Sequence, residues 1–125
     1  MLEYFKRAAE RGSTNAMRQL TAFYGEMKDY RKMIEFATMG INAGDKSLLY
    51  TAGKFCGRQR DFKNMLFYYK RAVDEHRDVK AMLELGKYYY HQQRNIPNML
   101  NYWEMALNTD EFGETESSVL LARLS

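Results

Sequence analysis

Cysteine and proline are nearly absent from this sequence of 125 residues, which contains one of each and only eight glycines. The single cysteine, Cys56, excludes an internal disulfide framework and favours a reducing compartment, so we predict a cytoplasmic protein. So little proline and glycine argues against a turn-rich β fold and against disorder. No apolar run approaches the roughly 18 residues of a membrane span, and no signal-peptide pattern is present. We therefore expect no membrane partner.

Histidine is also scarce, and the two histidines, His76 and His91, are not at a metal-ligand spacing. Cys56 lies on an apolar stripe that carries no histidine to act as a base, which favours a buried structural cysteine. The sequence has no glycine-rich phosphate loop and no nucleophile motif. These absences predict a protein that is not an enzyme and that needs no metal and no cofactor.

One motif of eight residues occurs four times, beginning at Met1, Met33, Met65 and Met99, with spacings of 32, 32 and 34 residues. In the third copy, Met65-Leu66-Phe67-Tyr68-Tyr69-Lys70-Arg71-Ala72, the apolar residues at i, i+4 and i+7 lie on one face of a helix. Each copy can bury that face only against neighbouring copies. A period of this length is the signature of a repeat solenoid.

A second kind of helix alternates with the first, and polar caps and small residues mark the boundaries between them. The predicted N-caps are Ser13 or Thr14, Asp29, Asp45, Asp61, Asp78 and Asn95. Glycine is favoured just past a helix C-terminus, and the predicted helix ends are Gly12, Gly25, Gly44 and Gly57. Small residues recur inside both helix types, which predicts close approach of neighbouring helices, at Thr21, Gly53 and Gly86 in one type and at Ala8, Gly40, Ala72 and Ala106 in the other.

The predicted fold is all-α, an α-solenoid of tandem antiparallel helical hairpins in a single domain of residues 1–125. It comprises a half repeat at 1–12, repeats at about 13–44, 45–77 and 78–110, and a C-terminal capping helix at about 114–124. We assign Phe23, Phe55, Tyr69, Tyr88 and Trp103 to the core, and expect Tyr50 and Tyr90 to be exposed. The first helix has an apolar face around Leu2, Phe5, Ala8 and Ala9 with no preceding helix to cover it, so we expect either a fragment of a longer solenoid or a homo-oligomer through this helix.

Residues 1–108 resemble tandem tetratricopeptide-type repeats of the Sel-one-like subclass. The resemblance rests on Ala81-x3-Leu85-Gly86-x2-Tyr89 in one helix type, and on Asp29-Tyr30-x2-Met33-x2-Phe36 and Arg7-Ala8-Ala9-Glu10-Arg11-Gly12 in the other. Two features depart from the family pattern: methionine begins all four second helices where alanine is usual, and the proline that often ends a repeat is missing.

The resemblance implies that one face of the first helix of each pair lines a concave groove for a partner segment. The matching positions are Asn15, Arg18, Ala22, Ser47, Tyr50, Lys54, Arg58, Lys80, Leu83, Lys87 and Tyr90. Five of these eleven residues are cationic and none is acidic, which implies a protein–protein interaction scaffold whose partner is an acidic peptide. The dicarboxylate clamp known in the family is matched only in part: Arg18 and Lys80 fit it, but Ala22, Thr51 and Glu84 do not.

Two other functions remain open at this stage. Helical repeats of similar length bind RNA at about one base per repeat, but the net charge of +3 is low for that role. The third possibility is a structural repeat protein that assembles with itself.

Overall fold

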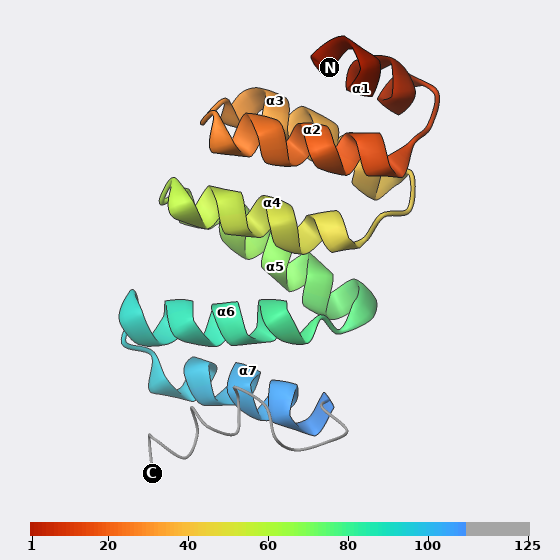
Figure 1. The fold of residues 1–125 in the computed structure, drawn as a ribbon. Helices are drawn as coiled ribbons and strands as arrows, with labels where there is room; N and C mark the ends of the chain where they lie inside the picture. Colours follow the sequence, from red (N-terminus) through yellow and green to blue (C-terminus); the bar gives the residue numbers. More distant parts are fainter. Residues whose placement is uncertain (110–125) are drawn as a thin grey trace. The chain divides into compact units, whose positions relative to one another are not determined.

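The computed structural model describes residues 1–109, which form seven α-helices and no strand (Figure 1). The helices are α1 (Leu2–Glu10), α2 (Thr14–Glu26), α3 (Tyr30–Asn42), α4 (Ser47–Arg58), α5 (Phe62–His76), α6 (Val79–His91) and α7 (Ile96–Thr109). The all-α prediction is therefore confirmed for this part of the chain. The capping helix predicted at about 114–124 lies outside the described residues. Within 1–109, no helix has both the length and the apolar character that crossing a membrane requires.

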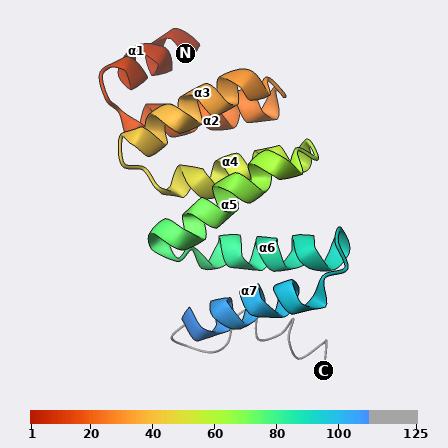
Figure 2. The same cartoon turned by 180° about the vertical axis from the view of Figure 1, so that it is seen from behind.

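The helices group into two compact units, Met1–Tyr68 and a second unit that begins at Tyr69. In the first unit α2 packs against α1, α3 and α4, and α3 also packs against α4 (Figure 2). In the second unit α6 packs against α7. Helix α5 runs across the boundary in the sequence.

Five predicted N-caps are confirmed, because each side chain accepts a hydrogen bond from a backbone N–H in the first turn of its helix. These bonds are Ala16 N to Ser13 Oγ at 3.2 Å, Lys32 N to Asp29 Oδ1 at 3.3 Å, Asn64 N to Asp61 Oδ1 at 3.3 Å, Lys80 N to Asp78 Oδ1 at 2.9 Å and Asn98 N to Asn95 Oδ1 at 3.1 Å. Asp45 differs, because Lys46 occupies the N-cap of α4. Asp45 Oδ1 instead accepts bonds from the backbone N and the Oγ of Ser47, at 3.2 and 2.5 Å.

Each residue that precedes one of these polar residues has a left-handed backbone. Two are glycines, Gly12 and Gly44, with φ of 98° and 103°, and both follow helices that end where glycine predicted. The others are cationic and not glycine: Lys28, Arg60, Arg77 and Arg94, with φ between 50° and 63°. A left-handed residue thus recurs at all six junctions between the described helices and turns the chain from one helix into the next, without strain at the two glycines and unfavourably at the four residues that carry a side chain.

Helices α2 and α4 end at Glu26 and Arg58, one residue after Gly25 and Gly57, so the predicted ends are close, but neither glycine is the left-handed residue past its helix. Gly25 lies inside α2, and a Cβ atom built on it would come within 2.6 Å of the Phe55 ring. Gly57 lies inside α4, and its Cβ would meet Met65 Sδ at 2.9 Å. Both glycines permit close packing, and the left-handed turn comes three residues later.

Two of the predicted small-residue positions are likewise contacts between helices. A Cβ on Gly40 would lie 2.2 Å from Leu48 Cδ1, and one on Gly86 would lie 2.0 Å from Trp103 Nε1. Trp103 is buried and its indole N–H donates to the Leu83 carbonyl at 3.2 Å, so the ring is fixed over Gly86.

Three of the five aromatic side chains assigned to the core, Phe55, Tyr69 and Trp103, are buried. Tyr88 is half-buried. The assignment of Phe23 is wrong, because 43% of its surface is exposed. Phe23 lies one position before the buried Tyr24, off the buried stripe of α2, and its ring meets that of Tyr24 edge-on instead of entering the core.

Substitution of Gly86 by alanine tests the close approach of α6 and α7. Gly86→Ala should lower the free energy of unfolding by about 1–3 kcal/mol, because the new methyl group overlaps a buried ring that a hydrogen bond holds in place. Gly57→Ala is the matched control, since its methyl meets only the flexible end of Met65, and higher helix propensity should offset the contact by up to about 1 kcal/mol. Denaturant titration followed by Trp103 fluorescence measures both. Equal effects of the two changes would contradict the packing described here.

Lys28 offers a second test, because its φ of 63° is unfavourable for a residue with a side chain. Lys28→Gly should raise the free energy of unfolding by about 0.5–1 kcal/mol through relief of this strain. The same change at the exposed Lys54, inside α4, should lower it by about 1 kcal/mol. Thermal and denaturant unfolding of the two variants should therefore shift in opposite directions.

Candidate partner-binding surface

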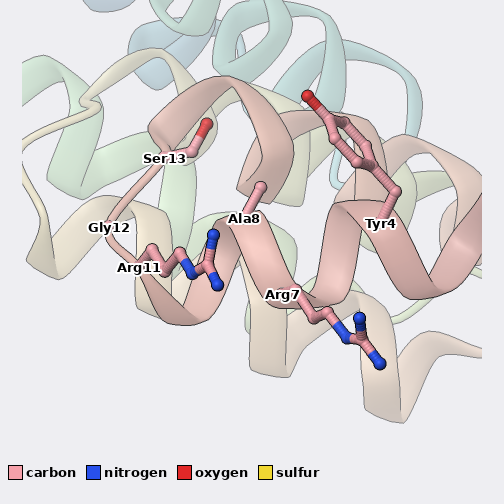
Figure 3. Close-up of a pocket in the computed structure, with 6 residues that line it drawn as sticks. All are labelled: Tyr4, Arg7, Ala8, Arg11, Gly12 and Ser13. Atoms are coloured by element: carbon pink, nitrogen blue, oxygen red, sulfur yellow. The ribbon is translucent and has the colours of Figure 1, made fainter.

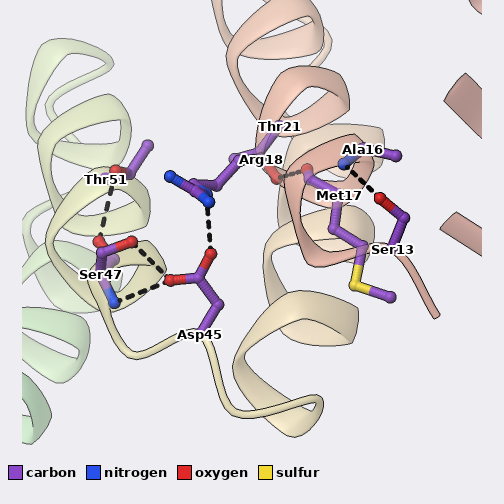
Figure 4. Close-up of polar contacts among 8 residues, drawn as sticks. All are labelled: Ser13, Ala16, Met17, Arg18, Thr21, Asp45, Ser47 and Thr51. Atoms are coloured by element: carbon purple, nitrogen blue, oxygen red, sulfur yellow. Dashed lines mark hydrogen bonds and ion pairs between the residues drawn. The ribbon is translucent and has the colours of Figure 1, made fainter.

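In the first unit, an ion pair links Arg18 on α2 to Asp45, the residue that leads into α4 (Figure 4). Arg18 Nε lies 2.8 Å from Asp45 Oδ2, and the Asp45 side chain is only 12% exposed. Since Oδ1 already accepts two bonds from Ser47, the two oxygens of this carboxylate have separate partners. The guanidinium of Arg18 is thereby fixed on the surface beside the start of α4.

A second ion pair joins the other ends of the same two helices. Arg58 Nη1 lies 3.4 Å from Glu26 Oε1, and the guanidinium also lies over the Phe55 ring at 5.3 Å. The two charged side chains of this pair are 50% and 71% exposed, so water screens the attraction far more than at Asp45.

Tyr50, Lys54 and Arg58 follow one another at intervals of four residues on α4, between the two ion pairs. Lys54 is exposed, and no hydrogen bond or ion pair to another described residue holds its ammonium group. Tyr50, a predicted candidate for an exposed contact, is half-buried. We call the surface formed by Arg18, Glu26, Asp45, Tyr50, Lys54 and Arg58 the α2–α4 face. Asn15, one turn before Arg18, is exposed at the beginning of α2.

The α2–α4 face contains Arg18 from α2 and Tyr50, Lys54 and Arg58 from α4, but its charge differs from that of the predicted list. Asp45 and Glu26 compensate Arg18 and Arg58, which leaves Lys54 as the cation without a carboxylate among the described residues. Sequence spacing along one helix could not show these carboxylates, because they come from a loop and from the last turn of a neighbouring helix.

In the second unit the predicted residues all belong to α6, and one of them is misplaced. Leu83 is 7% exposed and packs in the core, so it does not present a side chain to a partner. Lys80 is exposed, whereas Lys87 is half-buried with its Nζ 3.7 Å from Glu84 Oε1. Tyr90 is half-buried beneath the guanidinium of Arg94, which lies 5.7 Å from the ring centroid.

Two stacked ring pairs were not predicted as contacts. Tyr24 of α2 stacks on Phe36 of α3 with ring centroids 5.7 Å apart and planes 4° apart. Tyr89 of α6 stacks on Tyr102 of α7 at 5.8 Å and 2°. Phe36 and Tyr102 hold the same position in the repeated motif, so the recurrence of an aromatic residue there could have predicted these ring contacts.

A lysine lies over each of these ring pairs. Lys32 Nζ is 5.4 Å from the Tyr24 centroid, and Lys70 Nζ is 5.8 Å from that of Tyr89. A side-chain hydrogen bond with Tyr89 raises the pKa of Lys70, and burial raises the pKa of Tyr102. Both groups therefore keep their protons at neutral pH, with the amine charged and the phenol neutral.

Cys56 occupies the position on α4 that corresponds to Tyr24 and Tyr89, and it is buried. Burial, with a smaller contribution from the Asp61 carboxylate, raises the pKa of the thiol to about 11. A thiol that stays protonated at neutral pH is a poor nucleophile, because the thiolate is the reactive form. This environment agrees with a structural role for Cys56.

No family model matches this chain, and the curated proteins include no detectable relative of it. The surface chemistry described above therefore supplies the argument for function.

The two ion pairs of the α2–α4 face should differ in strength. A double-mutant cycle with Arg18→Met and Asp45→Asn should give a coupling of about 1–2 kcal/mol, since the Asp45 carboxylate is largely removed from water. The matched cycle with Arg58→Met and Glu26→Gln should give about 0.2–0.5 kcal/mol, as exposed pairs do. Denaturant titrations in low and high salt measure both couplings. A larger coupling for the exposed pair would contradict the assigned burial of Asp45.

Proposed function

We propose that this protein is a protein–protein interaction module of the tetratricopeptide type, with Sel-one-like repeats arranged as an α-solenoid, and that it binds an acidic partner segment. Recurring geometry supports the repeat assignment. The same ring contact occurs between α2 and α3 and between α6 and α7, at positions 65 residues apart for Tyr24 and Tyr89 and 66 apart for Phe36 and Tyr102. A left-handed residue followed by a polar residue also recurs at every junction between consecutive described helices.

The functional proposal rests on the cations of the α2–α4 face, two of which are already held in position by ion pairs. Arg18 and Arg58 are held by carboxylates, yet their side chains remain 51% and 50% exposed. A guanidinium has five N–H donors, and each ion pair engages only part of that set. A carboxylate from a partner can therefore bind to cations that are already positioned, which reduces the entropy lost on binding. Lys54, one turn before Arg58 on α4, has no carboxylate partner among residues 1–109 and attracts the partner.

This charge pattern favours an acidic protein segment over RNA. Glu26 and Asp45 lie beside the two arginines and repel the closely spaced phosphates of a nucleic acid strand. A peptide carries fewer charges than a nucleic acid strand, so it can place its carboxylates opposite Arg18, Lys54 and Arg58 and away from Glu26 and Asp45. Tyr50 adds an aromatic contact on the same face.

Charge reversal at Lys54 tests the proposal. A fluorescent peptide of twelve residues rich in glutamate and tyrosine should bind the protein, and Lys54→Glu should weaken binding about tenfold, mainly by slowing association and by flattening its salt dependence. The control is Lys63→Glu, which makes the same charge change at an exposed position of α5 outside the face. Lys87→Glu, tested in parallel, reports whether α6 contributes to the same binding.

Three outcomes would count against the proposal. Equal weakening by Lys54→Glu and Lys63→Glu would show a general charge effect and no defined face. Binding that neither substitution weakens would show that the peptide binds elsewhere on the protein. Tighter binding of a single-stranded RNA, with affinity that falls steeply with salt, would favour the RNA-binding alternative.

A further inference from the structure

Helix α1 carries an open slot. The equivalent positions on α3 and α7 are covered by the helix that precedes each of them. The slot has a volume of about 770 Å³ and is lined by Tyr4, Arg7, Ala8, Arg11, Gly12 and Ser13 (Figure 3). We call it the α1 slot. Tyr4, Arg7 and Ala8 belong to the first copy of the repeated motif, and Arg11, Gly12 and Ser13 follow α1 directly.

The matching positions on α3 and α7 show what such a slot receives. Tyr4 corresponds to Phe36 and Tyr102, each of which stacks on a tyrosine of the preceding helix. Tyr4 is 70% exposed, and its one described ring contact is edge-on with Phe5 of its own helix. The aromatic position of the motif is therefore present on α1, while its stacking partner is missing from the described residues.

The small residue of the motif gives the same indication. Ala8 corresponds to Gly40, Ala72 and Ala106, all of which are buried, whereas Ala8 is only half-buried. At Gly40 a Cβ would lie 3.4 Å from Met17 Cβ, so α2 passes directly over that position. An α-helix placed on α1 as α2 is placed on α3 would cover Tyr4 and Ala8 together.

Two cations in the α1 slot identify the chemistry of that helix. Arg7 and Arg11 are exposed on one side of α1, one turn apart, and neither has an ion-pair partner among the described residues. The corresponding residues of α5 are Arg71 and Glu75, which pair with each other. The helix C-terminus favours cations in this turn, but it does not require two of them facing the opening.

A second copy of this chain is a poor occupant. A two-fold contact centred on the α1 slot would bring Arg7 and Arg11 of both copies into one interface, where like charges are unfavourable. The positive charges of Arg7 and Arg11 favour a partner that carries carboxylates.

We propose that the α1 slot binds an amphipathic α-helix of a partner protein that has acidic residues in its first turn and an aromatic residue about three turns later. In the hairpin of α2 and α3, Tyr24 meets Phe36 near the end of α2, while the start of α2 lies at the C-terminal end of α3. A helix that docks antiparallel to α1 in the same way would stack its aromatic ring on Tyr4 and bring its first turn to Arg7 and Arg11. Acidic residues also stabilise the first turn of that helix through its dipole.

The test uses the complete chain and a peptide derived from α2. A labelled synthetic peptide with the sequence Ser13–Met27, carrying Thr14→Glu and Asn15→Glu, should bind with an anisotropy change that saturates. The peptide without these two changes should bind about tenfold more weakly, because it brings no carboxylates to the arginines.

Protein variants locate the binding. Arg7→Gln combined with Arg11→Gln should weaken binding of the acidic peptide about tenfold, and Tyr4→Ala should weaken binding of both peptides. The matched control is Arg31→Gln combined with Lys63→Gln, which removes the same charge at exposed positions outside the slot and should change binding less than twofold. Circular dichroism checks that each variant keeps the helical content of the parent chain.

Three results would overturn the proposal: no saturable binding of the acidic peptide, equal weakening by the two double variants, or binding that Tyr4→Ala leaves unchanged. The last would show that the peptide binds outside the α1 slot, as it would if it displaced α2 from its own place. Self-association in sedimentation experiments that Tyr4→Ala abolishes would assign the slot to a second copy instead. None of these results depends on Lys54, so the slot and the α2–α4 face are tested separately.

Discussion

The fold of residues 1–109 depends on one backbone feature, a single left-handed residue before each helix after α1. In each of the six junctions the following residue donates its backbone N–H to a carbonyl five or six positions earlier, as from Asp29 to Tyr24 at 2.9 Å and from Asn95 to Tyr89 at 2.8 Å. This bond closes the end of one helix, and in most junctions the same residue then accepts from the first turn of the next. A short, fixed turn of this kind sets the direction of the second helix of a pair, and so determines which faces meet.

The direction that these turns give to each helix also allows neighbouring helices to approach closely. The glycines at 25, 40 and 86 have a ring or a branched side chain from a neighbouring helix where a Cβ would stand. Gly86 lets α6 approach α7, and Tyr89 stacks on Tyr102 across the same hairpin. Gly25 and Gly40 let α2 and α3 approach α4, while Tyr24 stacks on Phe36 across the hairpin of α2 and α3. The stacking in turn defines the position that stays open on α1, where Tyr4 has no such partner among the described residues.

The two candidate surfaces use charge in different ways. On the α2–α4 face most of the charge is internally compensated, so the arginines are ordered and binding depends on replacing or extending existing ion pairs. In the α1 slot Arg7 and Arg11 lack carboxylate partners among the described residues and lie beside an exposed ring. An extended acidic segment suits the first arrangement, and a helix with charge at one end and an aromatic residue at the other suits the second.

The sequence by itself determined the helical class, the repeat period and five of the N-caps, because these depend on local spacing and on side chains that reach their own backbone. It could also place Arg18, Lys54 and Arg58 on exposed stripes. Only the tertiary structure decided which side chains contact one another. Gly25 and Gly57 looked like helix ends but serve close packing, Leu83 belongs to the core, and Phe23 does not. The carboxylates that compensate Arg18 and Arg58 come from other elements of the fold, and such contacts are set by how helices pack and not by the residues adjacent in the sequence.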